Sequence, residues 1–154
     1  MSTRYADNGN QATTTSSNKT ATSLQSIAGL RPYVYEFTMG ADGAPNSTDC
    51  SIVFTLQLWA SSAGTSTSFT PFPLDVGYQA AKASCGINFT GEPTYTAGST
   101  LWGPMGINQR ATYRWVAAPG SELVQVGTAT TGCGMQVKST NYGGQTDVIL
   151  YHGE

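Results

Sequence analysis

The 154-residue sequence predicts an all-β protein: an antiparallel β-sandwich, with the jelly roll as one candidate topology. Two observations predict this fold class. Apolar side chains recur at every second position through much of the chain after residue 32, which is the period of a half-buried strand. Glycine, proline and asparagine separate these segments at the short intervals typical of sandwiches. A short helix and an extended N-terminal arm are expected in addition.

The clearest alternation lies in residues 33–39 and 52–59. In the first segment, Tyr33 and Phe37 fall on one face with Tyr35 and Met39. In the second, Trp59 falls on the face opposite four aliphatic and aromatic residues. Weaker patterns predict six further short strands, at residues 94–96, 99–102, 109–117, 123–126, 134–138 and 147–151.

Residues 75–84 are the expected helix. Asp75 is a suitable N-cap, and the alanines within 80–83 favour a helix over a strand. Gly86 limits its length.

The N-terminal 28 residues form a separate compositional zone. Residues 1–22 are almost wholly polar, so this stretch cannot bury enough apolar surface to fold alone. The sequence therefore predicts an extended arm over residues 1–28 and a sandwich domain over residues 29–154. Within the arm, Arg4, Tyr5 and Lys19 are candidate contacts with a partner.

The composition argues against catalysis. The chain has seven basic residues, nine acidic residues and a single histidine, His152, and acid–base and metal chemistry depend on clusters of such groups. We expect no enzymatic activity, no cofactor and no metal site. A calcium site formed by Asp42, Asp49 and Asp75 is an alternative, but turn and strand-end roles for these carboxylates are favoured. His152 is expected to be exposed or to lie at an interface.

The charge balance bears on partners. A net charge of −2 is unlike that of proteins that bind nucleic acid or anionic membranes, and charged residues make up only 10% of the chain. A surface so poor in charge is weakly protected against association, which favours a homo-oligomer. The three cysteines, Cys50, Cys85 and Cys133, are widely spaced and fit buried thiols better than a disulfide framework.

Large side chains outside the predicted core face supply further interface candidates. Trp59 lies on the outer face of its strand, and Trp102 precedes a Gly-Pro turn. Arg110 and Arg114 share one face of the strand expected at 109–117, where they would reach acidic groups of a neighbouring subunit. These four residues complete the set of predicted interface positions.

Four segments resemble parts of small structural proteins of tailed bacteriophages, and together they span roughly residues 31–126. They are residues 31–36 (RPYVYE), 64–75 (GTSTSFTPFPLD), 92–98 (EPTYTAG) and 108–124 (NQRATYRWVAAPGSELV). The resemblance implies a virion component. It supplies no catalytic residues.

Within that class, a small all-β protein with a polar arm is typical of a capsid decoration, or cement, protein. The resemblance implies a protein made in the host cytoplasm that binds the major capsid protein on the outer capsid surface, as a homo-oligomer with a trimer favoured. Two alternatives remain open: a tail-associated adaptor or fibre-base protein, and a carbohydrate-binding β-sandwich module. No nucleic acid or membrane partner is expected.

Overall fold

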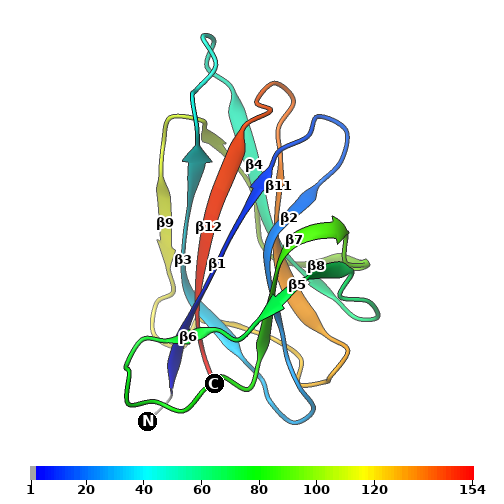
Figure 1. Ribbon diagram of the computed structural model, residues 1–154, viewed down its shortest axis with the longest axis vertical. Coiled ribbons are helices and arrows are strands. Elements are labelled where there is room, and N and C mark those ends of the chain that lie inside the picture. The colour runs from blue at the N-terminus through cyan, green and yellow to red at the C-terminus, as the bar shows by residue number, and fades with distance from the viewer. Residues whose placement is uncertain (1–2) are drawn as a thin grey trace.

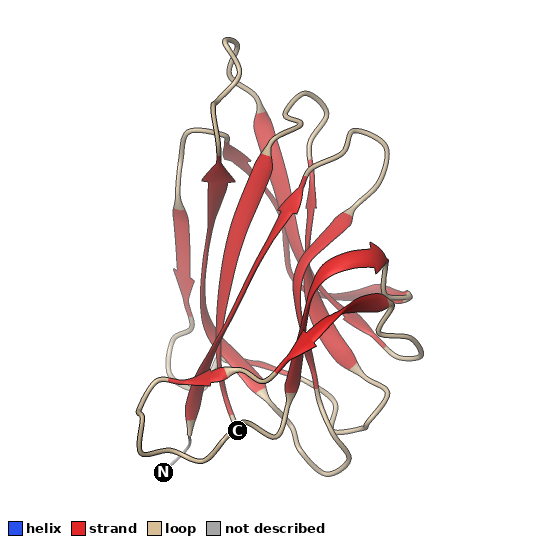
Figure 2. Ribbon diagram, viewed as in Figure 1, coloured by secondary structure: helices blue, strands red, loops and turns tan. Residues whose placement is uncertain are grey.

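A computed structural model describes residues 3–154 as two six-stranded antiparallel sheets packed face to face (Figures 1 and 2). Sheet A contains β1 (Arg4–Ala12), β3 (Tyr33–Asp42), β6 (Phe72–Pro73), β9 (Tyr113–Val116), β10 (Leu123–Val124) and β12 (Gln145–Gly153). Sheet B contains β2 (Lys19–Gln25), β4 (Ser51–Trp59), β5 (Thr65–Phe69), β7 (Ser84–Gly91), β8 (Tyr95–Asn108) and β11 (Gly132–Lys138). The predicted antiparallel β-sandwich is confirmed.

The strand order shows that the chain repeatedly changes sheets. Sheet A runs β10-β3-β12-β1-β6, with β9 also paired to β3, and sheet B runs β5-β7-β2-β11-β4-β8. The short segment between β5 and β6 crosses from one sheet to the other, along the edge visible at the lower part of Figure 1.

Within residues 3–154 no helix has the length and apolarity needed to cross a membrane.

The core lies between the two sheets. Strands β3 and β12 contribute Phe37 and Leu150, while β4 and β11 contribute Phe54, Leu56 and Met135, and all five side chains are fully buried. Each such side chain contributes roughly 1.5–3 kcal/mol of transfer free energy. This packing holds the two sheets together.

The prediction of an extended N-terminal arm is wrong for the residues that the structure describes. β1 lies inside sheet A, paired with β12 along its whole length and with β6 at Tyr5 and Ala6. β2 lies inside sheet B, between β7 and β11. Thr20, a buried polar residue of β2, makes its hydrogen bonds within the sandwich, as described below. Residues 1 and 2 of the predicted arm lie outside the described residues.

The predicted helix at residues 75–84 is also wrong. A single turn forms, in which Tyr78 N–H donates to the Asp75 carbonyl oxygen at 2.9 Å, and the chain then extends into β7. The N–H groups of Lys82 and Ala83 donate to the carboxylate of Glu154. A tertiary contact thus takes the donors that an α-helix would need, and overrides local propensity.

A β-bulge changes the face assignment of the segment 33–39. The register between β12 and β3 shifts where Tyr151 and His152 face Glu36 and Val34, so Tyr35 has no direct partner. As a result Tyr33 and Tyr35 lie on the outer face, whereas Phe37 and Met39 lie in the core. Strict alternation predicts that all four side chains share one face, because a period of two residues cannot indicate the extra residue of a β-bulge.

The other predicted strands are present with altered limits. Segments 94–96 and 99–102 are parts of the single long strand β8, and the segment 109–117 forms β9 only at its centre. Strands β1, β2, β5, β6 and β7 were not predicted from the sequence.

Candidate functional site

A cluster of charged side chains is buried at the end of the sandwich where β1 begins and β12 ends. His152 Nδ1 lies 3.0 Å from Asp7 Oδ2, and neither side chain is exposed to solvent. His152 Nε2 lies 3.7 Å from Glu154 Oε1, and the Tyr5 ring stacks on the imidazole with the ring centroids 5.3 Å apart. The ring N–H groups are not aligned for good hydrogen bonds, so these contacts are ion pairs.

The two carboxylates control the protonation of the imidazole. Burial by itself lowers the pKa of His152, but the adjacent Asp7 and Glu154 outweigh it and raise this pKa to about 9. Burial likewise tends to raise the pKa of Glu154, but His152 and the N–H groups of Lys82 and Ala83 lower it. The imidazolium is therefore the stable form at neutral pH. The expectation that His152 is exposed or at an interface is wrong for this fold, because its side chain is enclosed by the core.

Two thiols lie close to this cluster. Burial and the charge of Asp7 raise the pKa of both Cys85 and Cys133. Gln125 Nε2 donates to Cys133 Sγ at 2.8 Å. Both thiols are at most 2% exposed and are held in the neutral form, so the arrangement does not activate a nucleophile for a substrate in solution. All three cysteines are unpaired by disulfides.

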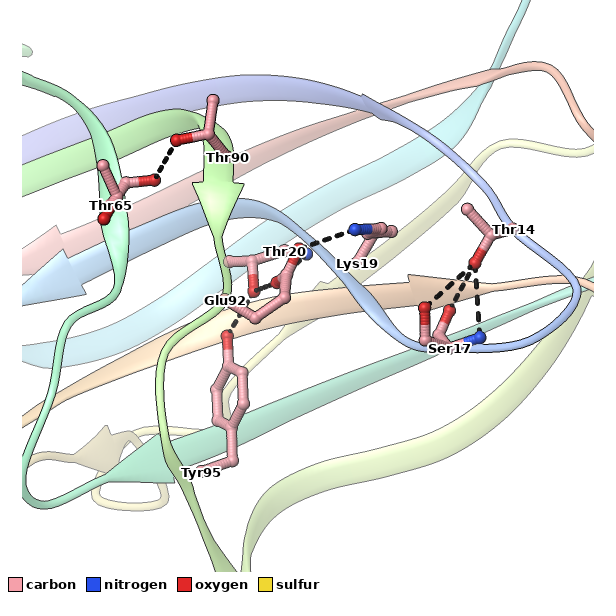
Figure 3. A network of polar contacts seen from close by, with 8 residues as sticks. All are labelled: Thr14, Ser17, Lys19, Thr20, Thr65, Thr90, Glu92 and Tyr95. Atoms are coloured by element: carbon pink, nitrogen blue, oxygen red, sulfur yellow. Dashed lines mark hydrogen bonds and ion pairs between the residues drawn. The ribbon is translucent and has the colours of Figure 1, made fainter.

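A second polar network lies on the outer face of sheet B (Figure 3). Glu92 Oε2 accepts hydrogen bonds from the N–H of Thr20 at 2.8 Å and from its hydroxyl at 2.6 Å. The Thr20 hydroxyl oxygen also lies 2.7 Å from the Tyr95 hydroxyl. Lys19, a predicted interface residue, forms an ion pair with Glu92 at 3.6 Å. This network ties the loop before β8 to the buried strand β2.

The two tryptophan candidates have different positions. Trp59 is 1% exposed, and its ring contacts Tyr95 edge-on with the ring centroids 6.1 Å apart. It does lie on the outer face of sheet B, as its parity predicts, but Tyr95 and Gly132 enclose it. It therefore offers no surface to a partner in this fold. Trp102 is half-buried and contacts the rings of Phe37 and Tyr113 at the margin of the core.

The arginine candidates are exposed, and two form ion pairs within the chain. Arg110 Nε donates to Asp49 Oδ1 at 2.7 Å, and Arg114 Nε donates to Glu36 Oε1 at 2.6 Å. Arg4 instead lies over the Tyr35 ring, 5.5 Å from its centroid. Tyr5, the neighbour of Arg4, is 2% exposed and faces inward.

The outer face of sheet A carries a row of mostly apolar residues that crosses five strands and includes one charged residue, Glu36. Val116 on β9 pairs with Glu36 on β3, Glu36 with Tyr151 on β12, Tyr151 with Ala6 on β1, and Ala6 with Phe72 on β6. Directly paired residues share a face of the sheet.

The adjacent row contains Val124, Tyr33, Gly153 and Arg4, and Leu74 N–H donates to the Arg4 carbonyl oxygen beside it. We call the two rows, together with Tyr35, the outer stripe. Sequence reasoning missed this surface, because the bulge hid the orientation of the tyrosines and the strand β6 was not predicted.

The loops at the end of the sandwich that holds both chain termini can be followed in Figure 1. They bear three exposed apolar side chains. Val76 is 97% exposed, Val126 is 52% exposed and Ile27 is 41% exposed. The loops bearing Ile27 and Val126 are joined by a hydrogen bond from Gly29 N–H to the Gly127 carbonyl oxygen. We call these three residues the apolar tip.

The aspartates weighed as calcium ligands have separate local roles. Asp49 pairs with Arg110, and Asp75 Oδ1 accepts the N–H of Gly77 within a turn. Among residues 3–154, no three His, Cys, Asp or Glu side chains are arranged to hold a metal ion.

Comparisons with protein-family models, with curated proteins and with solved structures gave no match.

Proposed function

We propose that this chain is a structural protein of a tailed-phage virion, namely a capsid decoration protein that binds the outer capsid surface and stabilises contacts between major capsid subunits. The resemblance of the segments within residues 31–126 to phage structural proteins motivates the proposal. In this proposal the protein is a non-catalytic homo-oligomer. It stabilises the capsid by burying surface area against the capsid subunits.

The strand order supports the proposal. When β5, β6 and β7 are set aside, sheet A contains β9 or β10, β3, β12 and β1, and sheet B contains β2, β11, β4 and β8. We propose that this arrangement is a jelly roll, the double Greek key that recurs in viral capsid and lectin domains. In this interpretation β5–β7 are an insertion that widens both sheets along one edge.

The apolar tip is the observation that carries the proposal. Ile27, Val76 and Val126 project from loops, where side chains of this kind gain nothing from the core of their own domain. Charged residues are scarce throughout the chain, so little electrostatic repulsion opposes contact with another protein. We assign the tip as the surface that contacts the capsid.

An oligomer strengthens such a contact. Three exposed apolar side chains form a small contact, but several linked copies bound to neighbouring capsid subunits multiply the affinity through effective concentration. The resulting complex bridges subunits that would otherwise separate.

The alternatives make different predictions. A tail adaptor or fibre-base protein is present in few copies per particle, whereas a decoration protein is present in hundreds. A carbohydrate-binding module predicts coplanar, exposed aromatic rings. The rings of Tyr33, Tyr35 and Tyr151 are half-buried and tilted by 52° and 39° to one another, and Arg4 covers one of them, so this geometry argues against the carbohydrate-binding alternative.

The test is quantitative mass spectrometry of purified particles of the phage whose genome encodes the chain, with heads and tails separated. We expect a high copy number of the protein on heads. We also expect that a variant with Val76→Asp and Val126→Asp in the apolar tip is released from the heads or is absent from them. A low copy number confined to tails supports the adaptor alternative, and absence from the particle overturns the proposal.

A further inference from the structure

We propose that the outer stripe of sheet A is the surface through which copies of this chain associate with one another. The inference deepens the homo-oligomer of the proposed function by naming its interface. Its occupant is a second copy of the same chain, and three observations support this assignment.

The first observation is the composition of the stripe. Phe72 is 65% exposed, Leu74 and Val116 are each 51% exposed, and Val124 is 43% exposed. Between them lie the half-buried rings of Tyr33, Tyr35 and Tyr151. Tyrosine and large aliphatic side chains on one continuous face are typical of the central part of a protein interface.

The second observation is the contrast with the opposite side of the sandwich. On the outer face of sheet B, Gln136 Nε2 donates to Gln57 Oε1 at 2.8 Å, and the Thr20 network covers the neighbouring strand. The large apolar ring on that face, Trp59, is already enclosed. The outer face of sheet B is thus mostly polar, whereas the outer face of sheet A carries exposed apolar side chains beside the ion pair of Glu36 with Arg114.

The third observation is a pair of opposite charges that the monomer does not join. Arg4 and Glu122 line the same groove, of about 380 Å³, with Tyr33, Tyr35 and Val116. Glu36 also lines this groove, but its carboxylate is already paired with Arg114. Within residues 3–154 Arg4 forms no ion pair and makes its contact with the ring of Tyr35. The Glu122 carboxylate accepts the N–H of Gly120 at 3.2 Å and has no cationic partner among the described residues.

These charges make the face complementary to itself. Arg4 lies at the start of β1 and Glu122 immediately precedes β10, so two strands of sheet A, β3 and β12, separate them. A second copy docked in the reverse direction brings its Glu122 to Arg4 and its Arg4 to Glu122. A two-fold contact repeats each interaction in this way.

The test is the solution mass of the purified chain, measured by light scattering over a wide concentration range. We expect the unaltered protein to form an oligomer, and Phe72→Lys and Val116→Lys to shift it toward the monomer. Both positions are more than half exposed, so the changes should preserve the fold, which circular dichroism checks. Thr55→Lys, on the outer face of sheet B, is the matched control and should leave the mass unchanged.

Charge reversal gives the sharper readout. Arg4→Glu or Glu122→Arg alone should raise the dissociation constant by about tenfold or more, because like charges then face each other across the contact. The double variant R4E/E122R should restore association, and an equimolar mixture of the two single variants should recover it as well. A defect in folding would not be rescued by mixing.

Failure of this inference differs from failure of the proposed function. A chain that is monomeric at all concentrations, or an oligomer indifferent to the stripe variants, overturns the interface while leaving incorporation into virions to be decided by mass spectrometry of particles. An oligomer that depends on the stripe but is absent from virions upholds the interface and overturns the decoration role.

Discussion

The carboxylate of Asp7 and the imidazole of His152 face each other at 3.0 Å across neighbouring strands, and both side chains are fully buried. Charged groups are rarely enclosed in this way unless each has a partner, because removing an ion from water is costly. Glu154 provides a second carboxylate at 3.7 Å from the same ring and also binds the backbone before β7. The cluster of Asp7, His152 and Glu154 therefore connects β1 and β12 to residues 75–84, the segment that the sequence predicts to be helical.

We predict that stability falls as the pH rises from about 6.5 to beyond 9. The pKa of His152 is raised in the folded protein to about 9, so its stabilising contribution is complete below the unfolded value near 6.5 and is lost as the pH passes through about 9. Urea unfolding at several pH values measures this loss, which should be on the order of 2–4 kcal/mol.

Asp7→Asn is the variant that checks the origin of this pH dependence. Removing one partner of a buried pair should cost about 3–5 kcal/mol at neutral pH. Stability of the variant should then vary much less between pH 6.5 and 9. An equal slope in both proteins would assign the effect to other groups.

We predict that Gly132→Ala destabilises the protein by about 1–3 kcal/mol, as expected for overpacking. A Cβ at this position would overlap the ring of Trp59 and would lie 2.5 Å from the Leu24 carbonyl oxygen, which belongs to the backbone and cannot easily move. Thermal unfolding measures the change. Gly143→Ala is the control, since a Cβ there meets nothing within 4 Å, and a similar loss in both variants would contradict the packing argument.

We predict that Glu92→Ala costs about 1–3 kcal/mol, because it leaves the buried N–H of Thr20 without its acceptor and removes one of the two partners of the Thr20 hydroxyl. Lys19→Ala removes only the partly exposed end of the same network and should cost less than about 1 kcal/mol. Denaturant midpoints of the two variants give the comparison. Equal effects would show that the ion pair, and not the hydrogen bonds to Thr20, is the important contact.

We predict that one thiol reacts with an aromatic disulfide reagent in the native protein and two more react only after unfolding. Cys50 is half-buried and accessible, whereas Cys85 and Cys133 are buried with raised pKa values. Reaction rates with and without urea, compared between the unaltered chain and Cys50→Ser, check this. Rapid native labelling of the Cys50→Ser protein would show that the core opens readily.

The sequence predicted the sandwich because β3, β4 and β12 have the apolar period of strands with one buried face. It did not predict β1 and β2, since Asp7 and Thr20 are buried polar residues whose partners lie far along the chain. Glu92 and His152 supply two of these partners, at separations that no local pattern reveals. The same limit explains residues 75–84, where the distant carboxylate of Glu154 decides the conformation.

The candidate surfaces were predictable only in part. Arg4 was identified as an interface position and lies on the outer stripe, whereas Trp59 and Tyr5 were identified and are enclosed. Parity placed Trp59 on the correct face of its strand, but it could not show that Tyr95 would cover that face. Phe72 was not predicted as an interface residue. The prolines on either side of it, Pro71 and Pro73, are typical of an edge strand, but they do not indicate which face of the sheet the Phe72 ring occupies.

The pairing of Arg4 with Gly153 has a mechanical consequence. Since β1 and β12 are antiparallel neighbours and these residues lie at the same end, a force that pulls the two ends apart breaks the hydrogen bonds of this ladder one after another. A force applied along the strands from opposite ends of the sheet instead loads many of these bonds at once, in shear. The β1–β12 ladder therefore resists tension along its strands from opposite ends better than tension that separates Arg4 from Gly153.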